Sequence, residues 1–184
     1  MSERMTFGRA INRGLHRALA DDPKVLLMGE DIGALGGVFR ITDGLQAEFG
    51  EDRVLDTPLA ESGIVGTAIG LAMRGYRPVV EIQFDGFVYP AFDQIVANLA
   101  KLRARTRGAV PMPVTIRIPF GGGIGLAHPA ADMLQRHPCQ AGTGGGNAVA
   151  TRDQGDHVVM DVTLKGRVGH IQGLRAAQGA AIGQ

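Results

Sequence analysis

Acidic side chains stand where apolar segments of this sequence begin or end. Glu61 follows the stiff Pro58 in the stretch "DTPLAESG", residues 56–63, and stands three residues before the start of the apolar run 64–73. An acid is favoured in the first turn of a helix, where unpaired N–H groups and the helix dipole attract negative charge. A carboxylate at this position could also exchange a proton with a ligand. The residue types alone leave both interpretations open.

Further polar residues follow two other apolar runs. Glu30 and Asp31 end the run "LLMGED". In "VVEIQFDGF", two-residue alternation predicts three polar side chains on one side of a strand, with aromatic ones near its end: Glu81, Gln83 and Asp85, then Phe84 and Phe87. Acids and an amide beside aromatic surface could hold a flat heterocycle, since carboxylates handle protons and Phe stacks on rings. The same residues also fit helix caps, a core amide and core aromatics.

The elements that would position these side chains alternate between two periods. Short runs rich in Val and Ile are typical of strands, and apolar stripes at helical spacing lie between them. The sequence predicts strands at 24–29, 53–57, 77–84 and 113–119, and helices at 7–20, 43–49, 61–74 and 90–106. This alternation predicts an α/β fold, a mainly parallel sheet with helices on both faces and ligands at the carboxyl ends of the strands. Glu30, Glu61 and the segment after Gln83 are then expected along one rim.

Residues 121–184 differ in character from the rest of the chain. They contain no Phe, Tyr or Trp, and they hold 14 of its 28 glycines. Aromatic side chains bury large areas and glycine costs conformational entropy, so this composition is poorly suited to a core. Only 156–166 has the pattern of a strand. We expect one domain at 1–125 and a divergent, Gly-rich, poorly ordered tail at 126–184, which a shifted reading frame or a linker would both explain.

Composition and spacing exclude several classes of function. A net charge of +1, with charges mixed along the chain, predicts no nucleic-acid partner. No apolar run has the length of a membrane span, and a single cysteine, Cys139, fits a reducing compartment, so a cytoplasmic location and no membrane partner are expected. The five histidines lack ligand spacing, so no metal site is predicted. The glycine runs lack a phosphate-binding fingerprint.

Three segments together resemble one enzyme family. "GEDIGALGGVFRITDGLQAEFG", "DTPLAESGIVGTAIGLAMRGYRPVVEIQF" and "GFVYPAFDQIVANLAKLR" are similar to the β subunit of the thiamin-diphosphate-dependent 2-oxo acid dehydrogenase, the decarboxylating component of the pyruvate and branched-chain complexes. The resemblance covers about residues 5–125 and implies a transketolase-type pyrimidine-binding domain. It implies that an α subunit holds the diphosphate and Mg²⁺ of thiamin diphosphate, and that the β subunit holds the aminopyrimidine. A lipoyl acyltransferase core is the other partner it implies.

The resemblance also implies roles for four residues. Glu61 falls on the glutamate of the family's TP-x-x-E motif, which hydrogen-bonds a pyrimidine nitrogen and favours the imino tautomer needed for catalysis. Glu30 falls on the acid of the GE[DE] motif, which implies a place in a chain of carboxylates and waters linking active sites. Gln83 and Phe87 fall on positions that line the aminopyrimidine pocket. "EIQF" favours branched-chain 2-oxo acids over pyruvate, and acetoin dehydrogenases are also similar here.

The sequence departs from the family after "IPFGGGIG". The family continues with a His-His-Ser-x-Ser-Pro-Glu segment, whereas this chain reads "LAHPAADMLQRHPCQ", so His128 receives no role. Three functions follow from these observations. The chain is a β subunit that is active with an α subunit, a non-catalytic fragment that folds but cannot assemble, or a small nucleotide-binding module. The missing phosphate fingerprint argues against the module.

Overall fold

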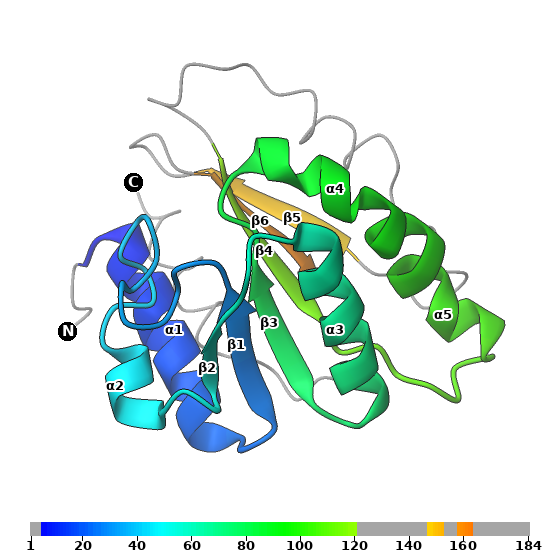
Figure 1. The fold of residues 1–184 in the computed structure, drawn as a ribbon, viewed down its shortest axis with the longest axis horizontal. Helices are drawn as coiled ribbons and strands as arrows, with labels where there is room; N and C mark the ends of the chain where they lie inside the picture. The colour runs from blue at the N-terminus through cyan, green and yellow to red at the C-terminus, as the bar shows by residue number, and fades with distance from the viewer. Residues whose placement is uncertain (1–4, 121–146, 153–157, 164–184) are drawn as a thin grey trace.

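A single sheet forms the centre of the computed structural model, which describes residues 5–120, 147–152 and 158–163. Its strand order is β2-β1-β3-β4-β6-β5. The strands β1 (Val25–Gly29), β2 (Val54–Asp56), β3 (Arg77–Glu81) and β4 (Thr115–Phe120) pair in parallel. The strands β5 (Asn147–Arg152) and β6 (Val158–Thr163) extend the sheet beyond β4 in antiparallel pairing (Figure 1). The predicted mainly parallel sheet is therefore confirmed.

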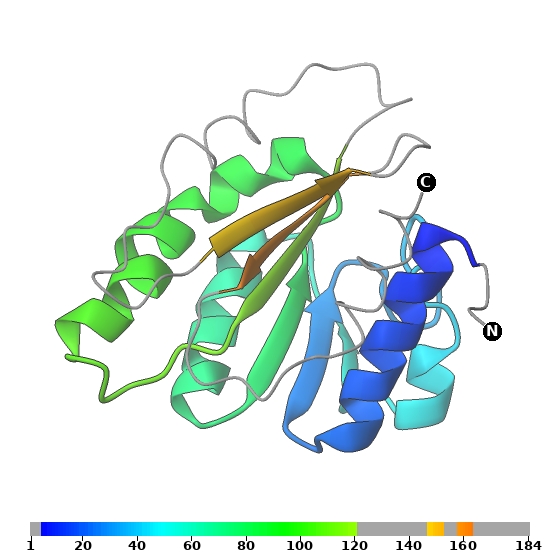
Figure 2. The same ribbon diagram turned by 180° about the vertical axis from the view of Figure 1, so that it is seen from behind.

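Helices cover both faces of this sheet. The helices α1 (Phe7–Asp21) and α2 (Leu45–Phe49) lie on one face, and α3 (Glu61–Met73) lies on the other. The same face as α3 carries a continuous helical stretch made of α4 (Val88–Asp93), a π-helical turn (Gln94–Leu99) and α5 (Ala100–Arg105). Figure 1 is viewed from the α3 side, and Figure 2 shows α1 across the opposite face. The described residues thus have the α/β layers that the sequence predicts.

Two hydrophobic cores follow from the two-residue alternation along the strands. Leu27 and Val79 belong to the core under α1, whereas Met28 and Val80 belong to the core under α3 and α4. Neighbouring residues in a strand point to opposite faces, so each buried strand supplies both cores. The predicted apolar stripe of α1 packs into the first core: Ile11, Leu15, Ala18 and Leu19.

The prediction for the third strand was too long. We predicted a strand to residue 84, but β3 ends at Glu81, and a 3₁₀ turn spans Asp85–Phe87 before α4. The N–H of Phe87 donates to the carbonyl of Phe84 at 3.0 Å, which closes this turn. Strand alternation therefore does not continue through Gln83 and Asp85.

The tail prediction is only partly covered by the described residues. The strand pattern at 156–166 is confirmed by β6, whereas β5 was not predicted, because "NAVATR" has too few apolar residues to mark a strand by itself. β5 pairs with β6 over its whole length. Most of the expected poorly ordered tail, with His128 and Cys139, lies outside the described residues.

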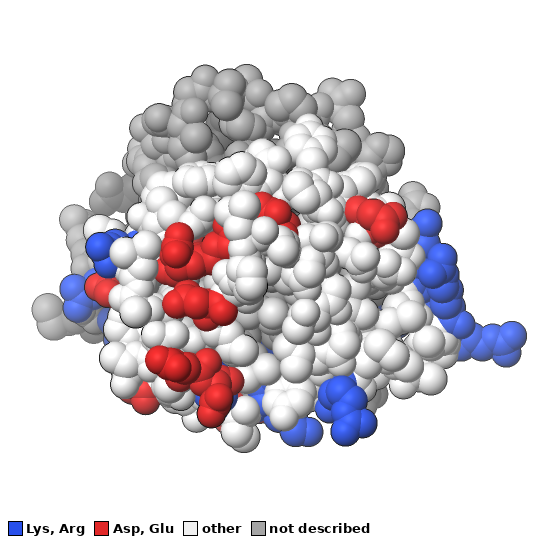
Figure 3. Space-filling model, in the orientation of Figure 1, with Lys and Arg blue, Asp and Glu red and all other residues white. Residues whose placement is uncertain are grey.

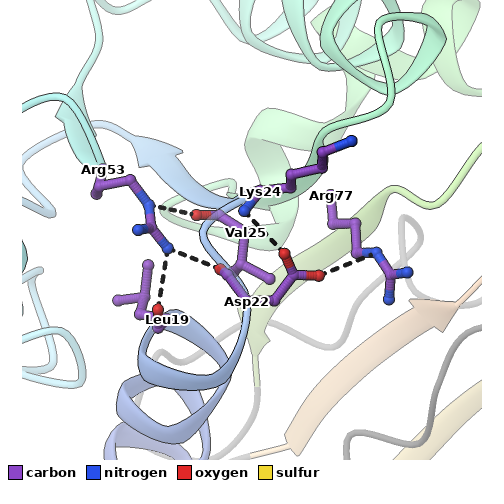
Figure 4. Close-up of polar contacts among 6 residues, drawn as sticks. All are labelled: Leu19, Asp22, Lys24, Val25, Arg53 and Arg77. Carbon is purple, nitrogen blue, oxygen red and sulfur yellow. Dashed lines mark hydrogen bonds and ion pairs between the residues drawn. The ribbon is translucent and has the colours of Figure 1, made fainter.

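The guanidinium group of Arg53 forms a clamp, defined by its hydrogen bonds to three carbonyls, at the amino ends of the strands. Arg53 Nε donates to the carbonyl of Val25 at 2.8 Å, and its Nη2 donates to the carbonyls of Leu19 and Asp22 at 3.0 and 2.9 Å (Figure 4). Arg77 pairs with the Asp22 carboxylate at 3.2 Å. Since the last carbonyls of a helix have no partner within the helix, Arg53 joins the end of α1 to β1 and β2.

We expect Arg53→Ala to lower the free energy of unfolding by about 2–3 kcal/mol, because three carbonyls lose a charged donor. Arg53→Lys should lose a similar amount, because a single ammonium lacks the planar fork that reaches all three carbonyls. Urea unfolding would measure both changes. Arg74→Ala, at an exposed arginine, is the control and should stay within about 0.5 kcal/mol. A loss in Arg53→Ala no larger than in the control would contradict the clamp.

Candidate functional site

The carboxyl ends of three parallel strands lie side by side at one rim of the sheet. Gly29 at the end of β1 is in register with Asp56 at the end of β2 and with Glu81 at the end of β3. The segments that leave these ends carry the predicted site residues, and the amino end of α3 begins at the same rim (Figure 1). Side chains on different segments can therefore act on one ligand here.

Gly29 lets β1 and β3 approach closely just before the first of these acids. A Cβ atom at position 29 would lie 2.7 Å from the carbonyl oxygen of Glu81, a distance that no side chain accommodates. On the other side of β1, the N–H of Thr57 donates to the carbonyl of Gly29 at 2.9 Å. The backbone at Gly29 is thus packed against Glu81 on one side and hydrogen-bonded to Thr57 on the other. Glu30, the next residue, is only 6% exposed.

Glu30 and Glu61 are two buried carboxylates, and the charge of Glu61 acts on Glu30. Glu61, the first residue of α3, is 8% exposed. Both carboxylate oxygens of Glu30 and the hydroxyl oxygen of Thr57 are buried without a hydrogen-bond partner. Burial, followed by the negative charges of Glu61 and Asp31, raises the pKa of Glu30 above its ordinary value. This arrangement can hold a proton on one acid beside a second acid.

Gln83 and Phe87 lie on the segment between β3 and α4. Gln83 is half-buried, and its Nε2 donates to Asp31 Oδ2 at 3.0 Å. Phe87 is 40% exposed, which is unusual for a large apolar ring. The ring of Phe84 packs edge-to-face between Phe39 and Phe87, with centroid distances of 6.0 and 5.7 Å. Phe87 therefore offers an accessible ring face or edge that other aromatic rings support.

Glu81 does not belong to this ligand-facing set. The sequence placed it with Gln83 and Asp85 on one side of a strand, but its buried carboxylate forms an ion pair with Arg117 of β4. Sequence reasoning missed this pair, although a single arginine among the apolar residues of "TIRIPF" signals a buried counter-charge. It also assigned no role to Thr57 or to the contact between Asp31 and Gln83. Thr57 stands inside the quoted "DTPLAE" motif, which is the signal that could have found it.

The family profile described as "Transketolase, pyrimidine binding domain" matches residues 3–138, which is more than half of the chain. The chain belongs to this family. The fold and the rim described above are thus those of a transketolase-type pyrimidine-binding domain, as the sequence predicted.

The chain is also similar to curated proteins over much of this domain. It is 72% identical over 117 residues to "Pyruvate dehydrogenase E1 component subunit beta" of Leifsonia xyli subsp. xyli, covering 64% of this chain and 35% of that protein. It is 58% identical over 137 residues to "3-methyl-2-oxobutanoate dehydrogenase subunit beta" of Mycobacterium tuberculosis, covering 74% and 39%. The chain spans well under half the length of these relatives. The predicted similarity to 2-oxo acid dehydrogenase β subunits is confirmed.

Charge is distributed unevenly over the pyrimidine-binding domain. Figure 3 shows most of the acidic side chains on the α1–α2 side of the view, and basic ones at the left margin, at the far end of α5 and along the lower edge. The rim residues Glu30, Asp31, Glu61, Gln83 and Phe87 include no cation. In the described part of the chain, no group of three or more His, Cys, Asp or Glu residues could hold a metal ion. No described helix is long and apolar enough to cross a membrane.

We expect Glu30→Gln to stabilise the pyrimidine-binding domain at neutral pH and to change nothing in acid. The pKa of Glu30 is raised above its ordinary value of 4.5, so the folded chain binds more protons than the unfolded chain between the two values. The contribution of Glu30 to folding stability is fully present below pH 4.5. It is lost as the pH rises through the pKa that Glu30 has in the folded chain. Thermal unfolding of both chains from pH 4 to 8 would measure the difference. An equal effect at every pH would contradict it.

Proposed function

We propose that this chain supplies the aminopyrimidine half of a thiamin-diphosphate site in the decarboxylating component of a 2-oxo acid dehydrogenase. The observation that carries the proposal is Glu30, buried with two unpartnered oxygens beside the buried Glu61 at the strand-end rim. Buried polar groups are normally satisfied, and the exceptions mark functional sites or unseen ligands. Membership of the pyrimidine-binding family supports a heterocyclic ligand at this rim.

The residues at the rim fit one half of thiamin diphosphate and not the other. Two acids, an amide and an accessible phenyl ring suit an aminopyrimidine, which needs proton partners at its nitrogens and an apolar neighbour for its ring. A diphosphate with Mg²⁺ needs cations near the phosphates and a group of metal ligands. The named rim residues include no cation, and the described part of the chain has no group of three or more His, Cys, Asp or Glu residues that could hold a metal ion. An α subunit that holds the diphosphate and Mg²⁺ would complete the site.

Four of the rim residues have a proposed task toward this ligand. Glu61 holds a proton at a pyrimidine ring nitrogen, Gln83 hydrogen-bonds at the ring edge, and Phe87 packs on the ring. Glu30, with its raised pKa, keeps a second proton near Glu61. The chemistry that thiamin diphosphate supplies when bound is an electron sink for the loss of carbon dioxide from a 2-oxo acid. The chain contributes the geometry and the placed protons.

Exposed apolar side chains around the rim support a second chain as partner. Leu59, just before α3, is 76% exposed, and four others lie on the segments that follow β1 and β3: Leu35, Val38, Phe87 and Tyr89. Apolar side chains gathered around a site are typical of a surface that another protein covers. We propose that the α subunit covers this surface and that the assembled component transfers the acyl group to a lipoyl acyltransferase core.

Co-expression with an α subunit of this enzyme family tests the proposal. Co-purification of the two chains, followed by thiamin-diphosphate-dependent decarboxylation, is the expected result. Pyruvate and 3-methyl-2-oxobutanoate should both be offered, because the relatives carry both names and the sequence-based preference for branched-chain substrates stays a prediction. A chain that elutes alone in size-exclusion chromatography would refute the proposal and support the non-catalytic fragment.

A further inference from the structure

We propose that Asp31 is a positioning residue, which acts on the ligand through Gln83. This inference rests on the proposed function, because it assigns Gln83 to the ligand. Asp31 Oδ2 accepts a hydrogen bond from Gln83 Nε2 at 3.0 Å, so a residue that follows β1 holds the side chain that follows β3. The two residues are 52 positions apart in the sequence. Asp31 itself is not among the residues proposed to contact the ligand.

The backbone at Asp31 is shaped for this contact. Its φ is +56°, in the left-handed region that residues other than glycine seldom adopt. The carbonyl of Asp31 accepts from the N–H of Gly37 at 2.8 Å, which closes the following loop onto this turn. One consequence is that two consecutive acids lie in different environments, since Glu30 is buried and Asp31 is exposed. A strained turn that persists is held by its surroundings and is often part of a functional site.

The chemistry of the contact fixes the orientation of the Gln83 amide. An ionised carboxylate only accepts hydrogen bonds, so the amide nitrogen of Gln83 must face Asp31 and its carbonyl oxygen must face away. An asparagine at position 31 could donate or accept, and Gln83 could then bind it in either orientation. The negative charge of Asp31 therefore selects one of the two orientations of the Gln83 amide. An asparagine at position 31 has nearly the same size but would not select between them.

The same loop also supports the aromatic member of the site. Phe39 packs edge-to-face on Phe84, and Phe84 packs on Phe87. The loop from Asp31 to Phe39 thus contacts the segment from Gln83 to Phe87 twice, once by a hydrogen bond and once through aromatic rings. The polar contact sets the direction of the amide, whereas the ring contacts set the position of the segment.

The first test needs neither the α subunit nor the cofactor. In the full chain labelled with ¹⁵N, the side-chain amide resonances of Gln83 should move and its protons should exchange faster with water in Asp31→Asn. Asp43→Asn removes a charge from an exposed position later in the segment between β1 and α2 and should leave these resonances unchanged. Asp31→Gly removes the carboxylate but accepts a positive φ, so it should reproduce the effect with the turn retained. Unchanged Gln83 resonances in both Asp31 variants would overturn the inference.

The second test measures thiamin diphosphate binding to the chain assembled with an α subunit. We expect Asp31→Asn to weaken binding about fivefold, the effect of one net hydrogen bond, with little change for Asp43→Asn. In a cycle with Gln83→Ala, the second substitution should add little to the first, because both remove one contact. Fully additive effects would overturn the inference. If no assembly forms, the proposed function fails, while the amide resonances still decide the role of Asp31.

Discussion

Glu61→Gln is expected to lower thiamin-diphosphate-dependent decarboxylation by the assembled component about a thousandfold, within the range typical of a lost acid–base group. Glutamine keeps the size and the hydrogen-bonding oxygen of the side chain, but it cannot give up or take a proton near neutral pH. Glu61 is 8% exposed at the first turn of α3, so water cannot readily replace it as the proton partner. The loss should appear in kcat more than in KM for the 2-oxo acid, since the role proposed for the carboxylate is in the reaction and not in substrate binding.

Glu51→Gln is the matched control for this prediction. Glu51 is an exposed glutamate in the turn before β2, so its replacement should leave the rate unchanged. Circular dichroism and co-purification with the α subunit would verify that both variants fold and assemble. A Glu61→Gln complex with native activity would show that the carboxylate has only the helix-terminal role that its position also allows.

The elements with strong local periodicity were predictable from the sequence. The stripe of Ile11, Leu15 and Leu19 predicts α1 and its buried face, and the apolar run after Glu61 predicts α3. Because parallel strands end at a common rim, the positions of Glu30 and Glu61 near each other followed from the predicted topology. The expected cofactor and residue roles came from the resemblance to 2-oxo acid dehydrogenase β subunits, because the spacing of apolar residues carries no information about them.

Contacts between distant segments were not predictable in the same way. The end of β3 at Glu81 depends on the turn that Phe84 and Phe87 close, whereas the alternating pattern continues to Asp85. The ion pair of Glu81 with Arg117 joins two strands, and neither residue identifies its partner by local sequence. Such pairs depend on strand order and register, which the sequence of one strand does not determine.

Arg117→Met is expected to lower the free energy of unfolding by about 3–5 kcal/mol, because it leaves the carboxylate of Glu81 buried without its counter-charge. The two side chains are 5% and 7% exposed, so water cannot solvate the remaining charge. Methionine has a similar length and can fill the space of the arginine stem. Urea unfolding would measure the loss, and Arg105→Met at an exposed position of α5 should stay within about 0.5 kcal/mol.

The double variant Glu81→Gln with Arg117→Met separates the stranded charge from the lost packing. It should recover most of the stability that Arg117→Met loses, since a buried ion pair replaced on both sides leaves no uncompensated ion. Nε and Nη2 of Arg117 are buried without hydrogen-bond partners in the native chain. The ion pair therefore stabilises the fold less than the contact alone suggests. A double variant as unstable as Arg117→Met would instead mean that arginine packing, and not charge, holds β3 and β4 together at the rim.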